Sequence, residues 1–228
     1  AHADIIAVQE VWDSDALEIV GAYRFADAQE LSQAQHETGL YSATLFNYNE
    51  QMQPYLAEGL ELGRSFIQPQ YWGKRSLDYL WYGIGAFIRK YPKYRYLFGP
   101  VSLSDTYPDE AKQLIIAFYT LYFGASKPCA EAIIPFVRKQ SERLQFNGND
   151  YKSEFTQFKH VLAKMGYAVP TLYKQYCDIA QLDGVKFHAF NIDPEFNHCV
   201  DGLVMVDIQQ LKPKKYQRYI AEDKKNQS

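Results

Sequence analysis

The chain has 228 residues, of which 47% are hydrophobic and 22% charged, the composition of a globular protein without low-complexity segments. This length predicts one domain, spanning residues 1–228, with enough chain for a substantial core. The net charge of −3 provides no overall basic field, which argues against nucleic acid as a partner. No apolar run approaches the roughly 18 residues of a membrane-spanning helix, so none is expected.

Three cysteines, Cys129, Cys177 and Cys199, are odd in number and form no CxxC pair. They fit a reducing, cytoplasmic compartment and predict neither a disulfide framework nor a zinc site. Histidines show no metal spacing, so no metal ligand is assigned. The chain opens with Ala1-His2-Ala3-Asp4, without Met and without a signal peptide. This start suggests a trimmed chain or a domain excised from a larger protein.

The first part of the chain reads as strands followed by a long helix. Two apolar runs separated by Asp13-Ser14-Asp15 predict a β-hairpin, and a third run stopped by Pro69 predicts another strand. Apolar residues at spacings of three and four then predict an amphipathic helix that ends before Pro92. The expected elements are strands at 5–12, 18–25 and 60–68, a helical turn at 28–35 and a helix at 75–91, with 41–46 ambiguous.

The second part continues with alternating strands and helices. The pattern predicts a strand at 96–103, a helix at 109–123 closed by Gly124, helices near 131–144, 151–165 and 170–180, and strands at 186–192 and 203–208. Residues 147–150 are interpreted as a loop. Strand–helix alternation in the middle, with strands at both ends, predicts a mixed α/β (α+β) domain.

One stretch of the sequence has the features of a phosphate-binding site. A strand containing Glu61 and Arg64 leads through Gly73 into the predicted helix, so backbone N–H groups point outward at the helix N-terminus. Lys74 and Arg75 add positive charge there, and Ser76 follows. An ordinary helix start with basic residues has the same pattern. Glu61, an ionisable residue in an apolar strand, is either exposed or paired.

Two other patterns have structural interpretations that we favour. His188 and Asp193 form the His-x4-Asp pattern of glycerolipid O-acyltransferases, but such a match arises readily by chance and lacks the following helix. Residues 212–215 (Lys-Pro-Lys-Lys) are interpreted as a solvated basic turn, with contact to an anionic membrane surface as the second interpretation. Aromatics, 16% of the chain, either fill the core or line a pocket for an apolar ligand.

Several segments in combination resemble a known family. They are EIVGAYRF (18–25), ELGRSFIQPQYWGKRSLDYLWYGIGAFI (61–88), RYLFGPVSLSD (95–105) and the tail from Val169 to Ile220 with its Asp-Pro-Glu-Phe turn. They look like the GNAT-type N-acyltransferases once labelled hemolysin-like, which include ornithine-lipid N-acyltransferases of lipid biosynthesis. The likeness covers residues 5–220. A more distant similarity, through Arg24 and the Glu61/Arg64 pair, is to acyl-homoserine-lactone synthases.

This resemblance implies a GNAT-like central β-sheet flanked by helices, and an enzyme without a permanently bound cofactor. It would move a fatty acyl group from acyl carrier protein or coenzyme A to an amine of an amino acid or amino lipid. Family members carry an N-terminal helical segment that is absent here, and some are fused to a glycerolipid O-acyltransferase. The location implied is cytoplasmic, with peripheral contact at the inner face of the membrane as a second possibility.

The same resemblance implies roles for individual residues. Glu61 is expected as the base that deprotonates the amine, with Arg64 beside it and Tyr119 as the acid for the thiolate. Donor-binding residues are expected to be Gly73, Lys74, Arg75, Ser76, Ser102 and Ser104, the last two for backbone donors to the oxyanion. Arg24, Phe98, Phe118 and Tyr122 are expected to bind substrate, the aromatics as walls of an acyl tunnel.

Two alternatives remain open at this point. One is a signal synthase of the acyl-homoserine-lactone type, although nothing in the sequence requires S-adenosylmethionine. The other is a GNAT-fold domain that binds an acyl carrier or a lipid without catalysis; the presence of both Glu61 and Arg64 argues against it.

Overall fold

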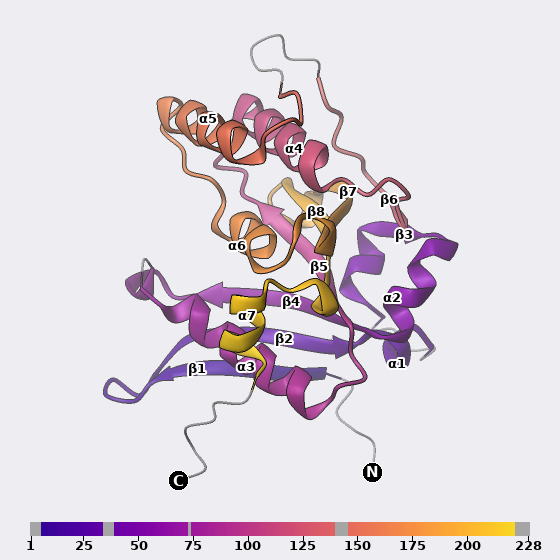
Figure 1. Ribbon diagram of the computed structural model, residues 1–228, viewed down its shortest axis with the longest axis vertical. Coiled ribbons are helices and arrows are strands. Elements are labelled where there is room, and N and C mark those ends of the chain that lie inside the picture. The colour runs from indigo at the N-terminus through magenta and orange to yellow at the C-terminus, as the bar shows by residue number, and fades with distance from the viewer. Residues whose placement is uncertain (1–5, 34–38, 73, 140–145, 222–228) are drawn as a thin grey trace.

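Six strands form the central sheet, in the order β1-β2-β4-β5-β8-β7 (Figure 1). The computed structural model describes residues 6–33, 39–72, 74–139 and 146–221. Neighbouring strands are antiparallel except β4 and β5, which are parallel. The strands are β1 (Ile6–Asp13), β2 (Glu18–Asp27), β4 (Gly59–Ile67), β5 (Tyr96–Leu103), β7 (Val185–Asp193) and β8 (Cys199–Asp207). Helices flank this sheet, so the predicted mixed α/β fold is confirmed.

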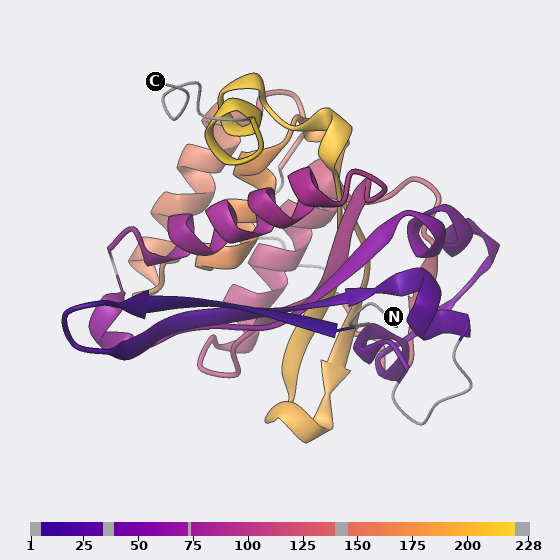
Figure 2. The same ribbon diagram turned by 90° about the horizontal axis from the view of Figure 1, so that it is seen from below.

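Helices cover both faces of the sheet. On one face α3 runs along the β1–β2 hairpin, as Figure 2 shows, and α4, α5 and α6 contribute to the same large core. The opposite face carries a smaller core with α1, α2 and the small two-stranded sheet of β3 and β6. The helices are α1 (Ala28–Gln33), α2 (Gln53–Ala57), α3 (Ser76–Lys90), α4 (Asp109–Phe123), α5 (Tyr151–Lys164), α6 (Thr171–Ile179) and α7 (Pro213–Tyr219).

Aromatic side chains build most of the larger core. Phe118 of α4 stacks on Phe158 of α5, with ring centroids 4.4 Å apart and planes 3° from parallel. Tyr119 packs against Phe123 and Tyr173. Such ring pairs add to the free energy gained by burying the rings themselves. Of the two interpretations of the aromatic composition, the structure supports core packing for these residues.

The helix expected near 131–144 is wrong for the residues that the structure describes. β6 (Ala130–Ala132) pairs with β3 (Phe46–Tyr48), and residues 133–137 then run extended beside β7. Ile134 N–H donates to Asn191 Oδ1 at 2.6 Å, and Phe136 N–H donates to Phe190 O at 3.0 Å. Pro135 lacks an N–H and disfavours helix. Residues 140–145 lie outside the described residues.

Two boundaries near the end of the chain also differ from the sequence-based expectation. β8 begins at Cys199, four residues before the predicted start at 203. Residues 212–215 lead into the helix α7 instead of forming a turn, with Pro213 at its first position. Proline is favoured there because the first helical N–H has no partner within the helix.

Close packing of α3 against α7 gives a stability prediction. A Cβ atom added at Gly85 would lie 1.9 Å from the carbonyl oxygen of Tyr219. Gly85→Ala should therefore destabilise the protein by about 1–3 kcal/mol, although Gly→Ala in an open helix position is stabilising. Chemical denaturation measures the difference. An unchanged or increased free energy of unfolding would contradict the packing described here.

Candidate active site: a cleft where two parallel strands separate

Strands β4 and β5 pair over only three residues. Gly59, Leu60 and Glu61 lie opposite Tyr96, Leu97 and Phe98, and no pairing of the two strands continues beyond them. β5 instead pairs along its whole length with β8. Figure 1 shows β5 turning steeply away from β4. The separating strands leave backbone N–H and C=O groups on their facing edges for another partner.

Two backbone features produce this separation. Gly99 of β5 has φ of 155°, and a Cβ atom there would lie 2.2 Å from the carbonyl oxygen of Leu62, so the two strands touch where they part. On β4 a β-bulge places Arg64 in the left-handed region, with φ of 49°. Bulges bend a strand and end regular pairing, and they occur often beside active sites.

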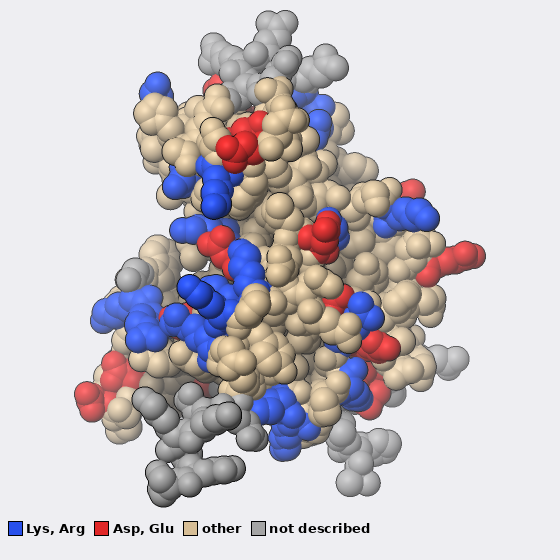
Figure 3. Space-filling model, in the orientation of Figure 1, with Lys and Arg blue, Asp and Glu red and all other residues tan. Residues whose placement is uncertain are grey.

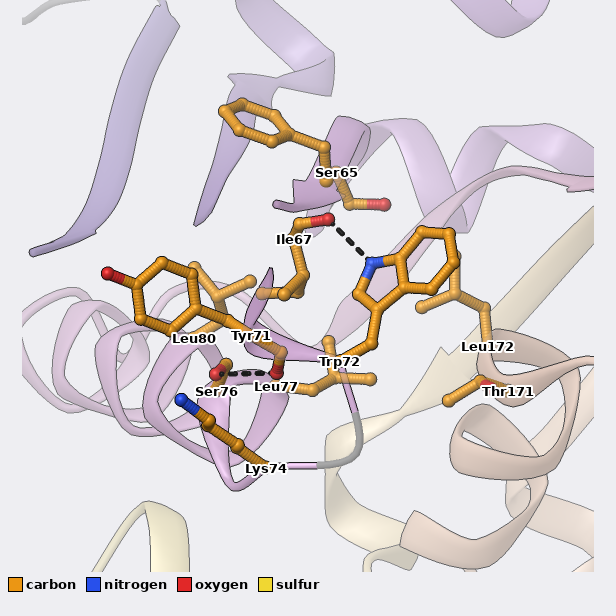
Figure 4. A pocket seen from close by; sticks show the side chains of 11 residues that line it. Ser65, Ile67, Tyr71, Trp72, Lys74, Ser76, Leu77, Leu80, Thr171 and Leu172 are labelled. Carbon is orange, nitrogen blue, oxygen red and sulfur yellow. Dashed lines mark hydrogen bonds between the residues drawn. The ribbon is translucent and has the colours of Figure 1, made fainter. Parts of the chain in front are cut away.

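A pocket of about 670 Å³ follows the free part of β4. Its walls come from the end of β4, the 3₁₀ turn η3 (Pro69–Tyr71), the start of α3 and the start of α6. Figure 4 shows the Trp72 indole, which donates to the carbonyl oxygen of Ile67 at 2.8 Å, at one side of this space. The lining is largely apolar and comprises Ser65, Phe66, Ile67, Tyr71, Trp72, Lys74, Ser76, Leu77, Leu80, Thr171 and Leu172.

The N-terminus of α3 opens onto this pocket. Arg75 occupies the N-cap position, and no side chain caps the helix. Ser76 Oγ donates to the carbonyl oxygen of Tyr71 at 3.3 Å, and the Lys74 ammonium lies 5.0 Å from the Tyr71 ring centre (Figure 4). Free N–H groups of the first turn and an adjacent cation suit an anion. The structure thus brings Lys74, Arg75 and Ser76 together as expected, while Gly73 lies outside the described residues.

Glu61 is buried on the other face of the sheet and is fully engaged. Its carboxylate accepts hydrogen bonds from Tyr41 N–H at 3.0 Å, from Ser42 N–H at 2.7 Å and from the Ser42 hydroxyl. These bonds hold the 3₁₀ turn η1 (Tyr41–Thr44) against β4. In this geometry Glu61 anchors η1.

Two arginines lie at the bulge. Arg24 Nη2 is 4.0 Å from Glu61 Oε2 and lies 3.9 Å from the position that a Cβ atom on Gly63 would occupy. Among the described residues Glu61 is its only ionic contact, so most donors of its guanidinium remain available. Arg64 is exposed at the bulge itself. Arg24 therefore contacts Glu61, whereas no ion pair joins Arg64 to Glu61 in the part of the chain that the structure describes.

A second polar group lies across the cleft on the same face as Glu61, at the ends of β5, β7 and β8. The Tyr41 hydroxyl donates to Asp193 Oδ2 at 3.1 Å, and the Ser102 hydroxyl donates to Asp201 Oδ1 at 2.6 Å. Burial, with Asp193 next in effect, raises the pKa of Tyr41 to about 12. Burial also raises the pKa of Asp201. The sequence singled out Ser102 but missed Tyr41 and Asp201, for which it held no motif.

Other expected site residues lie elsewhere. Phe98, Phe118 and Tyr119 are at most 1% exposed and pack in the cores, and Tyr122 donates from its half-buried hydroxyl to Glu154 at 2.6 Å. None of these four lines the pocket beside β4, so the geometry does not support a tunnel wall or, for Tyr119, an acid. Burial raises the pKa of Tyr119 further from the useful range. Ser104 Oγ accepts from Thr106 N–H and holds the turn after β5.

His188 is a buried histidine. Its Nδ1 accepts from Cys129 N–H at 3.0 Å, and burial lowers the pKa of His188 to about 4. Asp193 separately caps the turn that follows it. Within the described part of the chain, no group of three His, Cys, Asp or Glu could hold a metal ion. Within the same residues, no helix combines the length and apolar character needed to cross a bilayer.

Anchoring of η1 by Glu61 leads to a prediction. In Glu61→Gln the amide oxygen can accept on one side only, while the NH₂ group would face N–H donors. We expect a loss of about 1–3 kcal/mol of unfolding free energy in chemical denaturation. Glu131→Gln, at an exposed position on β6, should change stability by less than about 0.5 kcal/mol. Equal stabilities of the two variants would show that the three bonds to Glu61 contribute nothing.

Part of the chain matches a family model, and most of it is similar to named proteins. Residues 2–82, which include the cleft side of β4 and the start of α3, match the family model of the acetyltransferase (GNAT) domain. The chain is 26% identical to a glycine N(alpha)-acyltransferase of Phocaeicola vulgatus and 25% identical to one of Bacteroides thetaiotaomicron, each over 92% of this chain. It covers 68% and 65% of those relatives, or about two thirds of their length.

Two further proteins resemble the chain, one over a shorter stretch and the other at lower identity. An L-ornithine N(alpha)-acyltransferase of Brucella abortus is 37% identical over 76 residues, 32% of this chain and 26% of that protein. The loading GNATL domain of CurA from Lyngbya majuscula is 17% identical with a TM-score of 0.40, covering 84% of this chain and 72% of that one. From the family model and the named relatives, the chain resembles GNAT-like acyltransferases, and among them the N-acyltransferases of glycine and ornithine.

Proposed function

We propose that the protein transfers a fatty acyl group from a thioester of acyl carrier protein or coenzyme A to the amino group of an amino acid or amino lipid, in lipid biosynthesis. The observation that carries this proposal is the continuous path from the free edge of β4 to the uncapped N-terminus of α3. The names of the relatives, which act on glycine and ornithine, support an amine acceptor.

The donor fits this path in a definite orientation. Its phosphate would bind the first-turn N–H groups of α3 together with Lys74 and Ser76. The amides of its pantetheine arm would pair with the unpaired edge of β4, as an added strand does. The thioester carbonyl would then reach the bulge at Arg64, where β4 and β5 separate. Apolar side chains such as Ile67 and Trp72 would exclude water along the arm.

A basic surface surrounds the mouth of the donor pocket. Figure 3 shows Lys and Arg side chains gathered over the start of α3, over α6 and over α7. Exposed members are Lys74, Arg75, Lys174, Lys214 and Arg218. Asp78 forms ion pairs with two of these cations, with Arg75 at 3.5 Å and with Arg218. The positive charge suits either the phosphates of coenzyme A or an acidic carrier protein. The same charge would favour contact with an anionic membrane surface.

On the acceptor side, Arg24 suits the carboxylate of an amino acid. Its guanidinium lies over the β-bulge on the face of the sheet opposite α3, and most of its donors are free within the described residues. Arg–carboxylate contacts are strong and directional. A donor bound along the α3 face and an acceptor held by Arg24 on the other face would meet in the gap between β4 and β5.

Replacement of Lys74 tests the donor site. Lys74→Ala should raise the KM for an acyl thioester about tenfold while kcat changes little, because the lost contact is made equally by substrate and transition state. The matched control is Lys90→Ala, at the far end of the same helix, which should leave KM unchanged. Equal KM values for the two variants, measured by steady-state acyl transfer to glycine or ornithine, would refute the donor assignment.

Replacement of Arg24 tests the acceptor assignment. Arg24→Ala should raise the KM for glycine by about 10- to 100-fold, because a charge-assisted contact to the acceptor carboxylate is lost. Glycine methyl ester, which lacks the carboxylate, is the internal control and should be affected little. A similar loss for the acid and the ester would mean that Arg24 acts only through the fold.

The wild-type assay also separates the alternatives. Acyl transfer to an amine without S-adenosylmethionine supports the proposal. A requirement for S-adenosylmethionine with formation of a lactone would indicate the signal synthase. Thioester binding by calorimetry without transfer to any amine tested would indicate the non-catalytic carrier-binding domain.

A further inference from the structure

Ser102 and Asp201 form a cross-strand pair on the acceptor face of the sheet. They lie opposite each other in the β5–β8 register. On β5 the neighbours Val101 and Leu103 pack into the core beneath α3 and α4, so Ser102 points to the opposite face. Ser102 is exposed, whereas Asp201 is only 2% exposed. The 2.6 Å bond from Ser102 Oγ links the buried carboxylate to an exposed hydroxyl.

Every titratable group facing Asp201 in the described chain is neutral or negative. Cys199, on its own strand, donates through Sγ to Asp201 Oδ2 at 3.6 Å. Asp193 of β7 and Tyr41 of η1 lie close enough to interact through their charges, as does Tyr173 of α6. None of the ion pairs formed by described residues includes Asp193 or Asp201.

A buried carboxylate without a cation is costly unless something else compensates it. Here burial, and after it the charge of Asp193, raises the pKa of Asp201, which makes it a better proton acceptor than an exposed aspartate. Glu61, by contrast, has its carboxylate occupied by three donors from η1. Asp201 accepts from an exposed hydroxyl, that of Ser102, whereas the hydroxyl bonded to Glu61, that of Ser42, is itself buried.

We propose that Ser102 and Asp201 form the proton relay that deprotonates the acceptor ammonium group, and that Glu61 positions η1 instead of acting as the base. This inference rests on the proposed N-acyltransferase function. One N–H bond of the ammonium breaks and its proton goes to Ser102 Oγ, while the Ser102 hydroxyl proton goes to Asp201 Oδ1. The neutral amine then attacks the thioester carbonyl carbon, the C–S bond breaks, and the second ammonium proton ends on the thiolate. Asp201 afterwards returns its proton to solvent through Ser102.

The pH dependence of acyl transfer tests the relay. With Asp201 as acceptor, kcat/KM for glycine should be level between the pKa of Asp201 and that of the glycine amino group. In Asp201→Asn only amine that is already neutral can react, so the rate should rise about tenfold per pH unit across that range. At neutral pH the variant should be slower by about 10²- to 10⁴-fold. Affinity for the acyl thioester, measured by calorimetry, should not change.

Ser102 provides a second test that does not depend on a buried position. Ser102→Ala should show the sloping profile of Asp201→Asn, and Ser102→Thr, which keeps the hydroxyl, should restore the level region. The matched control is Asp207→Asn on the same strand, whose partner is Arg95; its profile should stay level. A level profile in Asp201→Asn or Ser102→Ala would overturn the relay while leaving the acyltransferase function intact. A wild-type protein that acylates no amine would overturn both.

Discussion

The site depends on one constraint, the end of pairing between β4 and β5 after Glu61 and Phe98. A parallel pair that continued would leave a closed sheet with no edge for a ligand. The contact of Gly99 with Leu62 and the bulge at Arg64 prevent this, and β8 takes over the other edge of β5. The facing edges of β4 and β5 are therefore unpaired beyond Glu61 and Phe98. The proposed donor site on the α3 face and the proposed acceptor site on the opposite face both lie beside this gap in pairing.

On the face of the sheet that carries Glu61, three buried carboxylates make different contacts. Glu61 fixes η1 to β4 through the backbone of Tyr41 and Ser42, and the Tyr41 side chain reaches Asp193 at the end of β7. One short turn thereby bridges the strands on the two sides of the gap. The other carboxylate oxygen of Asp193 accepts hydrogen bonds from the backbone N–H groups of residues 195 and 196. Asp201 is the carboxylate in this network that accepts from an exposed hydroxyl, that of Ser102.

Local signals in the sequence predicted the elements well and their contacts less well. The strand 96–103 and the helix 109–123 have the predicted bounds, because apolar periodicity and a closing Gly124 define them locally. The segment 131–137 could not be predicted, since its extended shape depends on bonds to β7, more than 50 residues later. The start of α3 followed from apolar spacing, whereas the sequence paired Glu61 with Arg64 and did not predict the contact of Glu61 with Arg24.

Pairing across 99 residues, as between Ser102 and Asp201, leaves no local signal in the sequence. The surroundings of the aromatic residues were hard to predict for a different reason, because a Phe in a core and a Phe in the wall of a tunnel have the same sequence pattern. Phe118 has a stacked ring on α5, a partner that could be identified only once the helices were placed.

The distribution of charge supports the division of the site into two sides. A net charge of −3 suggests no preference for any charged ligand. In the fold, however, exposed cations such as Lys74 and Arg75 lie at the mouth of the donor pocket, whereas the acidic Asp193 and Asp201 are buried on the opposite face. The proposed donor carries negatively charged phosphate, opposite in sign to Lys74 and Arg75. The proposed acceptor carries a positively charged ammonium group, opposite in sign to the acidic residues on the other face. Each substrate would therefore be attracted to its own side of the sheet and disfavoured on the other, which would keep the acceptor amine out of the donor pocket.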